Sequence, residues 1–432
     1  MISMRLMEYL ITGTIGIKFL LQLKRNQWRP LKELQTIQLK KLKAILYHAY
    51  NYVPYYHRLF KSARFVPEDL KGFKDLQKIP VTTKSDVQNN FSDFMAREMA
   101  PSKCVESFTS GTTGIPLKTY KDVRAASVDT ALKTYAFLEC GMKITDKFVT
   151  IAGTPRSLFL PNQTLISWFY ENSIILDYLR KINPAVIYAC PHIFEDLVTH
   201  DTSGINPKLI FSQAENLTQH CRNLIRLTFD LEINDTYGST EISRLAFECN
   251  EHSGLHLITD SGLLEFVDDN NEPVAAGEIG ETVVTGLNNY AMPLIRYDLG
   301  DLGVYSDERC ACGRSWPLIK SIDGRKSDVF ITPNGAKIYS HFLKKCVFSE
   351  IKKNLFIVSQ FQIVQEKRNK IVLKVVKGNK FDANIVDKIK NNIETLCVGF
   401  GEDISVETEI VQNISRDKSG KRRTIISMVN NS

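Results

Sequence analysis

Short apolar runs alternate with helical patterns in the middle of the chain, and this alternation limits the possible folds most strongly. The apolar runs lie at 148–151, 185–189 and 209–211, and the helical patterns at 174–181 and 217–229. Strands that are buried on both faces and connected by helices are typical of a parallel sheet. The sequence therefore predicts an α/β fold in which part of the sheet is parallel.

Other patterns precede and follow this α/β region. An amphipathic helix at 31–50, which ends before Pro54, precedes it. The segments 262–267 and 281–285 are separated by the polar turn 268–271. They predict antiparallel strands of a smaller, β-barrel-like subdomain.

The pattern changes again after Gly324. Segments 356–364 and 370–376 predict a hairpin, 385–397 a helix and 404–411 a further strand. A stretch of about a hundred residues of this kind suits a small α+β module. We therefore expect two domains, a large N-terminal one at 1–324 and a small α+β C-terminal one at 325–432.

Composition and charge exclude several classes of protein. The 432 residues carry a formal net charge of +7, and no basic stripe is interleaved with aromatic residues, so nucleic-acid binding has no support. Nine cysteines in so long a chain do not form a compact secreted disulfide pattern, which favours the cytoplasm. The apolar stretch 9–21 is too short and interrupted to be a transmembrane segment. Segment 18–28 either makes weak peripheral membrane contact or packs as an ordinary helix.

The segment 107–116 is rich in hydroxyl residues, contains two glycines and ends at Pro116. Such a loop can bring backbone N–H and side-chain O–H groups close to a polyphosphate. It is not a Walker A loop, because the second glycine of that motif falls on Pro116. The segment is either a nucleotide-binding loop or a polar linker without a ligand.

The segment 234–241 carries a second set of candidate groups. Tyr237 can pack on a base, Gly238 lets the backbone approach a phosphate, and Glu241 offers a hard oxygen ligand to Mg²⁺. Alternatively, the segment forms an ordinary turn with a helix cap at Ser239 or Thr240.

Three later segments complete the set. In 293–301, Asp301 can accept hydrogen bonds from a ribose diol, although a charged surface turn would look the same. Segment 324–328 lies where the sequence pattern changes. Segment 415–423 by itself is typical of a solvated basic tail.

Taken together, the order and spacing of these segments resemble the adenylate-forming enzymes, which include acyl- and aryl-CoA synthetases, luciferases and the adenylation domains of peptide synthetases. The resemblance covers nearly the whole chain. Segment 110–114 looks like the family's phosphate loop, 237–241 its adenine and magnesium motif, 296–301 its ribose motif, 324–325 its hinge and 419–421 its catalytic-lysine loop. Segments 52–56 and 79–84 are similar to the opening of the phenylacetate–CoA ligase branch, which includes capsule-associated relatives.

The resemblance implies a ligase that activates a small carboxylic acid with ATP and Mg²⁺, releases pyrophosphate and transfers the acyl group to coenzyme A. It implies catalytic roles for Lys421, Glu241 and Thr240, with Glu241 as the magnesium ligand. It also implies that the domain at 1–324 binds ATP and the acyl substrate, and that the domain at 325–432 is a mobile lid carrying Lys421. Rotation about 325–328 would present and withdraw this lysine. The residues that it implies for nucleotide binding are Thr109, Ser110, Gly111, Thr112, Thr113, Gly114, Ala214, Glu215, Asp235, Thr236, Tyr237, Gly238, Ser239, Asp301 and Arg325.

The sequence departs from the family at several positions. Leu117 stands where many members have lysine, and Ser327 stands where aspartate or lysine is frequent after the hinge arginine. The stretch 151–157 replaces a Tyr/Gly-rich part of the phenylacetate pocket, so the identity of the acid does not follow from the resemblance. Arg156 in this stretch either pairs with an acidic substrate or lies on the surface.

Four residues form a candidate zinc set. Cys310 and Cys312 are one residue apart, and Cys249 and His256 lie upstream. A set of three cysteines and one histidine is an acceptable tetrahedral ligand set for a structural Zn²⁺, and the resemblance implies the same pattern. The alternative is that these are free buried cysteines.

Two further hypotheses remain beside transfer to coenzyme A. The acyl-adenylate could react with an amine, such as an amino sugar in polysaccharide biosynthesis. The chain could also bind nucleotide without catalysis, although a non-catalytic protein has no need of Glu241 and Lys421.

Overall fold

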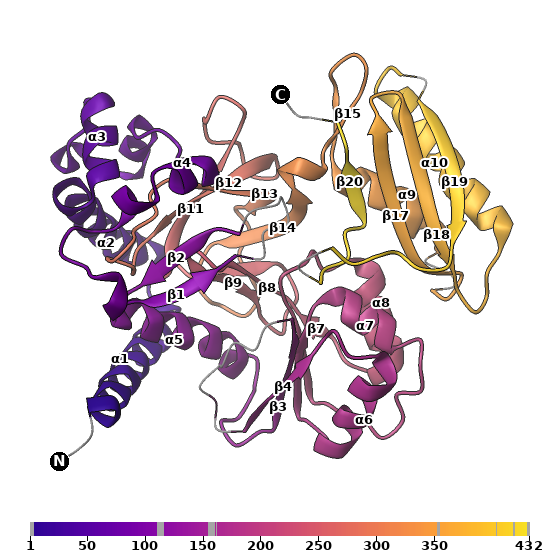
Figure 1. Ribbon diagram of the computed structural model, residues 1–432, viewed down its shortest axis with the longest axis horizontal. Coiled ribbons are helices and arrows are strands. Elements are labelled where there is room, and N and C mark those ends of the chain that lie inside the picture. Colours follow the sequence, from indigo (N-terminus) through magenta and orange to yellow (C-terminus); the bar gives the residue numbers. More distant parts are fainter. Residues whose placement is uncertain are drawn as a thin grey trace. The chain divides into compact units, whose positions relative to one another are not determined.

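The computed structural model describes residues 4–109, 116–153, 160, 162–351, 355–402, 404–417 and 420–429 (Figure 1). Its internal contacts divide the chain into two units. Unit 1 comprises 1–144 with 234–322, and unit 2 comprises 145–233 with 323–432. Among the described residues, no helix is both long and apolar enough to cross a membrane.

Unit 1 begins with helices. Its helices are α1 (Met4–Asn26), α2 (Leu31–Tyr52), α3 (Pro54–Ser62), α4 (Lys84–Asn89) and α5 (Val123–Glu139), with short 3₁₀ turns at Pro67–Asp69, Phe73–Lys78, Phe91–Phe94 and Pro101–Lys103. Helix α1 packs against α5. Its polar side chains Gln22 and Asn26 donate hydrogen bonds to the buried carboxylate of Asp260, which also pairs with Lys41 at 2.7 Å. This network fastens α1 and α2 to the strands of the unit.

Strands supply the rest of unit 1. Strands β1 (Val105–Phe108) and β2 (Lys118–Lys121) form a two-stranded antiparallel sheet. A second, seven-stranded sheet has the order β11-β12-β13-β14-β10-β9-β8. The sheet strands are β8 (Thr236–Ser239), β9 (Ser243–Glu248), β10 (Leu255–Leu257), β11 (Gly262–Val267), β12 (Ile279–Gly286), β13 (Tyr297–Ser306) and β14 (Leu318–Arg325). Pairing of β11 with β12 is antiparallel, with Gly262 opposite Gly286.

The first half of unit 2 is a five-stranded sheet of order β4-β3-β5-β6-β7. It comprises β3 (Phe148–Ala152), β4 (Gln163–Ser167), β5 (Val186–Ala189), β6 (Leu209–Ser212) and β7 (Ile233–Asn234), with helices α6 (Asn172–Ile182), α7 (Pro191–Leu197) and α8 (Gln219–Phe229). The pairs β3–β4, β3–β5 and β5–β6 are parallel. The core side chains of these strands and helices form one buried apolar cluster.

The second half of unit 2 is the C-terminal module. Its sheet has the order β19-β18-β17-β20. Its elements are a 3₁₀ turn (Lys326–Asp328), β15 (Phe330–Ile331), β16 (Lys337–Ile338), α9 (Ser340–Ile351), β17 (Val358–Lys367), β18 (Lys370–Lys377), α10 (Ala383–Gly399), β19 (Ser405–Val411) and β20 (Ile425–Ser427). Because β20 pairs in parallel with β17, the segment 412–424 has both of its ends fixed to the module. Segment 420–423 lies between these fixed ends.

The predicted fold class is confirmed. The predicted parallel strands appear as β3, β5 and β6, and the predicted hairpin and helix of the C-terminal module appear as β17–β18 and α10. The sequence patterns did not predict α5, because its buried residues lie on several faces of the helix rather than on one. Barrel-like closure of the seven-stranded sheet stays a prediction. A lid domain that begins at 325 also stays a prediction, and the contacts place 323–432 in one unit with the parallel sheet.

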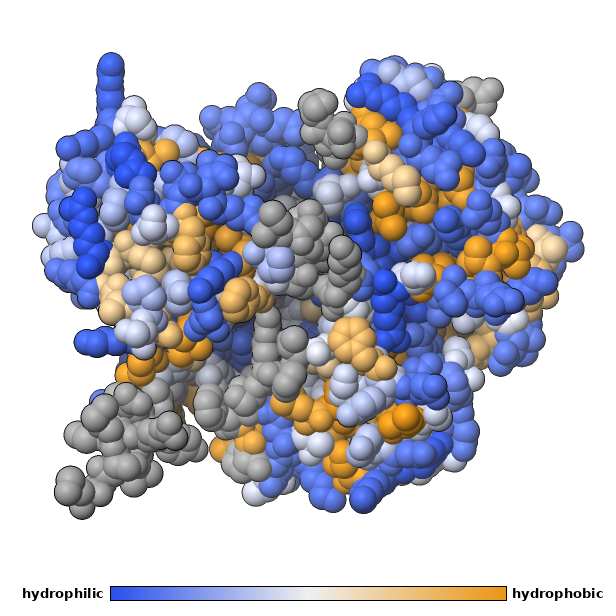
Figure 2. All heavy atoms as spheres, viewed as in Figure 1, coloured by the Kyte–Doolittle hydropathy of each residue, from blue (hydrophilic) through white to orange (hydrophobic). Residues whose placement is uncertain are grey.

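Hydrophilic side chains cover most of the face shown in Figure 2, and hydrophobic side chains form separate patches between them. Exposed large apolar residues include Leu21, Trp28, Phe169, Tyr170 and Leu227. Isolated groups of this kind are normal on a folded chain.

A buried carboxylate connects three elements of unit 1. Asp129 on α5 pairs with Lys133 at 2.7 Å and Lys121 on β2 at 3.6 Å, and it accepts a hydrogen bond from Ser243 on β9. Burial raises the pKa of Asp129, but the two ammonium groups outweigh burial and hold the pKa well below its ordinary value. The ionised carboxylate therefore stabilises the packing of α5 on β2 and β9.

We expect Asp129→Asn to lower the free energy of unfolding by about 3 kcal/mol at neutral pH, because two lysines lose their shared partner. A group with a lowered folded pKa stabilises above its unfolded pKa of about 4 and loses that effect as pH falls. The difference from wild type should therefore shrink below about pH 4, as urea denaturation at several pH values would measure. Asp177→Asn, at an exposed ion pair on α6, is the control. Equal stability of wild type and Asp129→Asn at neutral pH would contradict this account.

Candidate functional site

The base of the predicted phosphate loop is closed by two hydrogen bonds. The Thr109 N–H donates to the Leu117 carbonyl at 2.9 Å, and the Leu117 N–H donates to Thr109 Oγ1 at 2.8 Å. Strands β1 and β2 continue this pairing on either side. Ser110, Gly111, Thr112, Thr113 and Gly114 lie outside the described residues, as does Arg156.

Two predicted nucleotide-binding residues meet in unit 1. Tyr237 on β8 donates a hydrogen bond through its hydroxyl to Asp301 Oδ2 on β13, at 3.0 Å. Thr282 on β12 donates to the Asp301 carbonyl at 3.1 Å. A hydrogen bond therefore joins the adenine motif to the ribose motif, between two residues 64 positions apart in the sequence.

The remaining residues of the adenine motif end β8 and begin its connection to β9. Ser239 Oγ accepts a hydrogen bond from the Ile242 N–H at 3.2 Å, and Tyr297 donates to Glu241 Oε1 at 3.5 Å. A Cβ at Gly238 would lie 2.2 Å from the Ser243 carbonyl oxygen. Packing of β8 on β9 thus requires this glycine, and its approach to a phosphate stays a prediction.

Side-chain carboxylates hold the start of segment 234–241 in place. The Asp235 N–H donates to Glu248 Oε2 at 2.9 Å, and the Thr236 N–H donates to Asp235 Oδ1 at 2.8 Å. The assignment of Thr240 to the α-phosphate stays a prediction.

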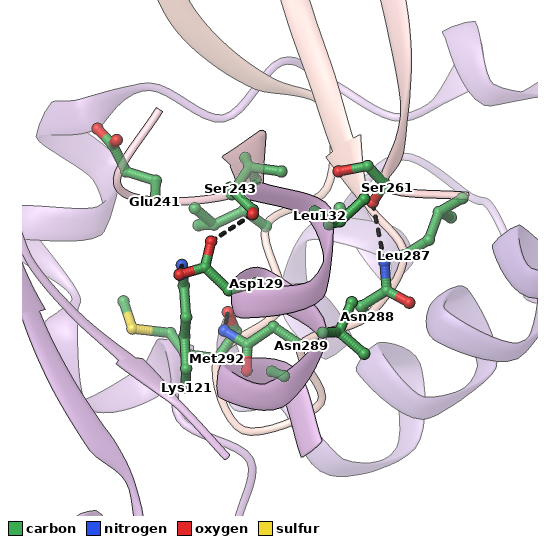
Figure 3. Close-up of a pocket in the computed structure, with 15 residues that line it drawn as sticks. Lys121, Asp129, Leu132, Glu241, Ser243, Ser261, Leu287, Asn288, Asn289 and Met292 are labelled. Atoms are coloured by element: carbon green, nitrogen blue, oxygen red, sulfur yellow. Dashed lines mark hydrogen bonds and ion pairs between the residues drawn. The ribbon is translucent and has the colours of Figure 1, made fainter. Parts of the chain in front are cut away.

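A small cavity lies beside Glu241 in unit 1 (Figure 3). Lys121, Asp129, Ser243 and Asn289 also line it. The cavity has a volume of about 20 Å³ for a water-sized molecule, and one water needs at least about 10–15 Å³. The cavity is therefore large enough for water and too small for an acyl group.

In unit 2 the structure brings together three other predicted residues. Lys421 Nζ donates to the Ala214 carbonyl at 3.0 Å, where Ala214 has a positive φ of 63°. The next residue, Glu215, accepts a hydrogen bond from the Arg422 N–H at 3.2 Å and lies 2.9 Å from His192 Nδ1. The predicted catalytic lysine thus lies on the predicted nucleotide segment 214–215.

Sequence reasoning missed the side chains that hold this arrangement. They are His192, Glu195 and Asp196 on α7, together with Arg416 and Arg422. Part of the arrangement could have been predicted from the sequence, since Arg422 directly follows Lys421. A basic run near the C-terminus, however, reads as a solvated tail unless its acidic partners are known.

Two arginines of the predicted motifs have clear structural surroundings. Arg296 is buried, pairs with Glu265 at 3.2 Å and donates to the Ile79 carbonyl at 2.7 Å. It therefore joins β11 to the segment before α4. Arg325 ends β14, and the 3₁₀ turn that follows it carries Asp328, which pairs with Arg423.

The four predicted zinc ligands converge in unit 1. Cys249 follows β9, His256 lies on β10, and Cys310 and Cys312 lie in the connection between β13 and β14. One ligand atom from each lies within 4.8 Å of the others. Cys249 Sγ is 3.6 Å from Cys310 Sγ, and Cys312 Sγ is 3.3 Å from His256 Nε2.

These separations fit tetrahedral coordination. Bonds of about 2.3 Å to sulfur and 2.0–2.1 Å to nitrogen at tetrahedral angles place two sulfurs about 3.8 Å apart and a sulfur and a nitrogen about 3.6 Å apart.

Burial raises the pKa of Cys249 to about 12. Burial also acts to raise the pKa of Cys312, but hydrogen bonds from Arg314 outweigh it and hold that pKa below its ordinary value.

Comparison with known proteins adds relatives to this geometry. The chain is 28% identical over 332 residues to phenylacetate-coenzyme A ligase of Thermus thermophilus, which covers 72% of this chain and 74% of the relative. It is 24% identical over 407 residues to protein CapK of Staphylococcus aureus, with 87% of each chain covered. The family model of the CapK C-terminal domain matches residues 330–428.

Solved structures agree on the fold. The crystal structure of 2-hydroxyisobutyryl-CoA ligase in the postadenylation state with 2-HIB-AMP superposes with a TM-score of 0.79 at 19% identity, covering 94% of this chain and 91% of that one. In sequence, this chain is similar to phenylacetate–CoA ligases and to CapK. In fold, it is similar to 2-hydroxyisobutyryl-CoA ligase. The CapK C-terminal match spans β15 to β20 and includes Lys421.

Proposed function

We propose that the protein activates a carboxylic acid with ATP through an acyl-adenylate, releases pyrophosphate, and then transfers the acyl group to coenzyme A. One observation carries the proposal: Lys421 Nζ lies 3.0 Å from the carbonyl of Ala214. The predicted catalytic lysine thus contacts the predicted nucleotide segment, in a chain whose relatives are CoA ligases.

In the first step, a carboxylate oxygen attacks the α-phosphorus of ATP, and the bond from that phosphorus to the bridging oxygen of pyrophosphate breaks. Two anions approach one another, so fixed cations and hydrogen-bond donors are needed where charge develops. The β- and γ-phosphates are assigned to Ser110, Thr112 and Thr113 with the loop amides. Lys421 is assigned to the carboxylate and α-phosphate oxygens.

The remaining nucleotide contacts follow from the motifs of unit 1. Thr240 is assigned to the α-phosphate, and Asp301 with Arg325 to the ribose. Glu241 is the residue that would hold Mg²⁺, whose charge would offset that of the triphosphate. The hydrogen bond from Tyr237 to Asp301 supports this placement, because it fixes the carboxylate beside the aromatic ring.

In the second step, the thiol sulfur of coenzyme A attacks the acyl carbonyl, AMP leaves, and the thiol proton is lost. We place Lys421 at the reaction centre only for the first step, with rotation about 325–328 withdrawing it for the second. The 3₁₀ turn at Lys326–Asp328, directly after the long strand β14, is a suitable place for such a hinge.

An amine acceptor, such as an amino sugar, is the second candidate for this step. The match to CapK covers 87% of both chains, whereas the match to the phenylacetate ligase of Thermus thermophilus covers 72% of this chain. For this reason we retain the amine acceptor as a hypothesis.

The direct test is pyrophosphate release over a panel of aryl, fatty, amino and hydroxy acids, each with and without coenzyme A. We expect release with at least one acid and an acyl-CoA product when coenzyme A is present. Acid-dependent release that coenzyme A does not increase, but an amino sugar does, would support the amine acceptor. Nucleotide binding without release across the whole panel would contradict the proposal and favour a non-catalytic protein.

Replacing the lysine tests its role. We expect Lys421→Ala to lose acid-dependent ATP–pyrophosphate exchange by about a hundredfold or more, because the developing charge loses its fixed cation. Transfer from supplied acyl-adenylate should be retained. Lys388→Ala, at an exposed lysine on α10 of the same module, should leave both reactions unchanged. Unchanged exchange in Lys421→Ala would refute the assignment.

We also propose that Cys249, His256, Cys310 and Cys312 hold a structural zinc ion. Three thiols and one imidazole fill all four tetrahedral positions, which leaves none for a reacting water. The four residues come from three separate parts of unit 1, so a metal there would join the ends of β9, β10 and the β13–β14 connection.

Metal analysis of protein purified without chelator should find about one zinc per chain. Cys312→Ser should lose the metal and lower the unfolding temperature, because metal binding is coupled to folding. Cys104→Ser, at a partly exposed cysteine outside the cluster, should retain zinc. Metal-free wild-type protein with a stable fold, or zinc retained in Cys312→Ser, would exclude the site.

A further inference from the structure

A buried guanidinium lies next to the predicted catalytic lysine. The Arg422 side chain is only 3% exposed. Its Nη1 donates to Asp196 Oδ1 at 2.7 Å and its Nη2 to Glu195 Oε2 at 2.9 Å. Both carboxylates belong to the last turn of α7, so the C-terminal module is fixed to the α/β half of unit 2 at this point.

Further groups from three segments meet at the same place. Arg416 donates through Nη2 to Asp196 Oδ2 at 3.2 Å and through Nη1 to the Trp168 carbonyl at 2.6 Å. Gln360 on β17 also donates to Asp196, at 3.2 Å. Asp196 therefore accepts hydrogen bonds from three different side chains of the C-terminal module.

The main chain of the lysine loop follows the same surface. The Arg422 N–H donates to Glu215, and Lys421 Nζ donates to Ala214. A Cβ at Gly420, whose φ is +86°, would lie 2.3 Å from Trp168 Nε1. The loop is therefore in close contact with Trp168 on one side and with segment 214–215 on the other.

The contacts of segment 420–423 with α7 and with segment 214–215 are called the joint below. The charges decide how strongly this joint depends on Arg422. Glu195 and Asp196 stand at the C-terminal end of α7, where the helix dipole disfavours negative charge. Burial raises the pKa of Glu195, and the Arg422 guanidinium counters that shift only in part. Removing one member of a buried ionic cluster leaves the others uncompensated, which costs more than an exposed pair does.

We propose that Arg422, through Glu195 and Asp196, is the positioning residue that holds Lys421 for the adenylation half-reaction, and that this joint opens for acyl transfer. The inference rests on the proposed function. The Arg422 guanidinium donates to Asp196, Glu195 and the His192 carbonyl, so its effect on Lys421 is exerted through the loop. Its loss should slow the first half-reaction and spare the second.

The test measures the two half-reactions of Arg422→Gln separately. Acid-dependent ATP–pyrophosphate exchange should fall about a hundredfold in kcat with little change in KM, because misplacement of a catalytic group by about 1 Å has that effect. Transfer from supplied acyl-adenylate should be unchanged or faster. Arg422→Lys should recover part of the exchange, since lysine keeps the positive charge but cannot donate to both carboxylates with the bidentate geometry of arginine. Arg180→Gln, at a partly exposed arginine of α6 that pairs with Asp177 in the same half of unit 2, is the control.

A second variant addresses the joint without removing a charge. Gly420→Ala places a methyl group against Trp168 and should also slow exchange selectively. Gly335→Ala is its matched control, because Gly335 has the same φ of +86° and no atom within 4 Å of an added Cβ. This pair keeps the inference testable if Arg422→Gln fails to fold.

Amide hydrogen exchange of segment 420–423 in the full chain gives a readout that needs no acid substrate. Exchange should be at least about tenfold faster in Arg422→Gln than in wild type or Arg180→Gln, because the joint protects the Arg422 amide. Equal loss of both half-reactions, or unchanged protection and activity, would overturn the inference. Absence of exchange with every acid in wild type would instead contradict the proposed function, while the amide measurement would still decide whether the joint exists.

Discussion

The ion pairs of Arg422 with Glu195 and Asp196 decide where Lys421 lies within unit 2. Two carboxylates at the end of a helix are unfavourable when buried, and they are stable there because guanidinium groups from the C-terminal module approach them. The same contacts bring the Lys421 ammonium to the Ala214 carbonyl. The catalytic role proposed for Lys421 requires such a fixed position, since a flexible lysine would spread its charge over many positions.

Electrostatics also organises unit 1. Asp129 joins α5, β2 and β9 through two lysines and a serine, and the Tyr237 hydroxyl connects the adenine motif to Asp301. Both networks lie around the turn that carries Glu241. The polar groups proposed to meet the nucleotide therefore rest on strands whose mutual packing is fixed by buried hydrogen bonds and ion pairs rather than by apolar contacts alone.

Much of the fold could be predicted from the sequence, because buried strands and amphipathic helices have distinct periodicities. The strands β3, β5 and β6 and the helices α6, α8 and α10 follow this rule. Helix α5 does not, because its surroundings bury residues on several faces. Likewise, the convergence of Cys249, His256, Cys310 and Cys312 was predictable from residue types, whereas the partners of Arg422 were not. Glu195 and Asp196 lie more than two hundred positions away in the sequence, and only the folded chain brings them to the lysine loop.

Acyl-adenylate formation is the central claim, and oxygen transfer tests it most directly. The acid substrate, labelled with ¹⁸O in its carboxylate, would be incubated with ATP and coenzyme A, and the released AMP would be analysed by mass spectrometry. Attack of the carboxylate on the α-phosphorus predicts that AMP gains one labelled oxygen. Unlabelled AMP, or label found in inorganic phosphate instead, would contradict the account.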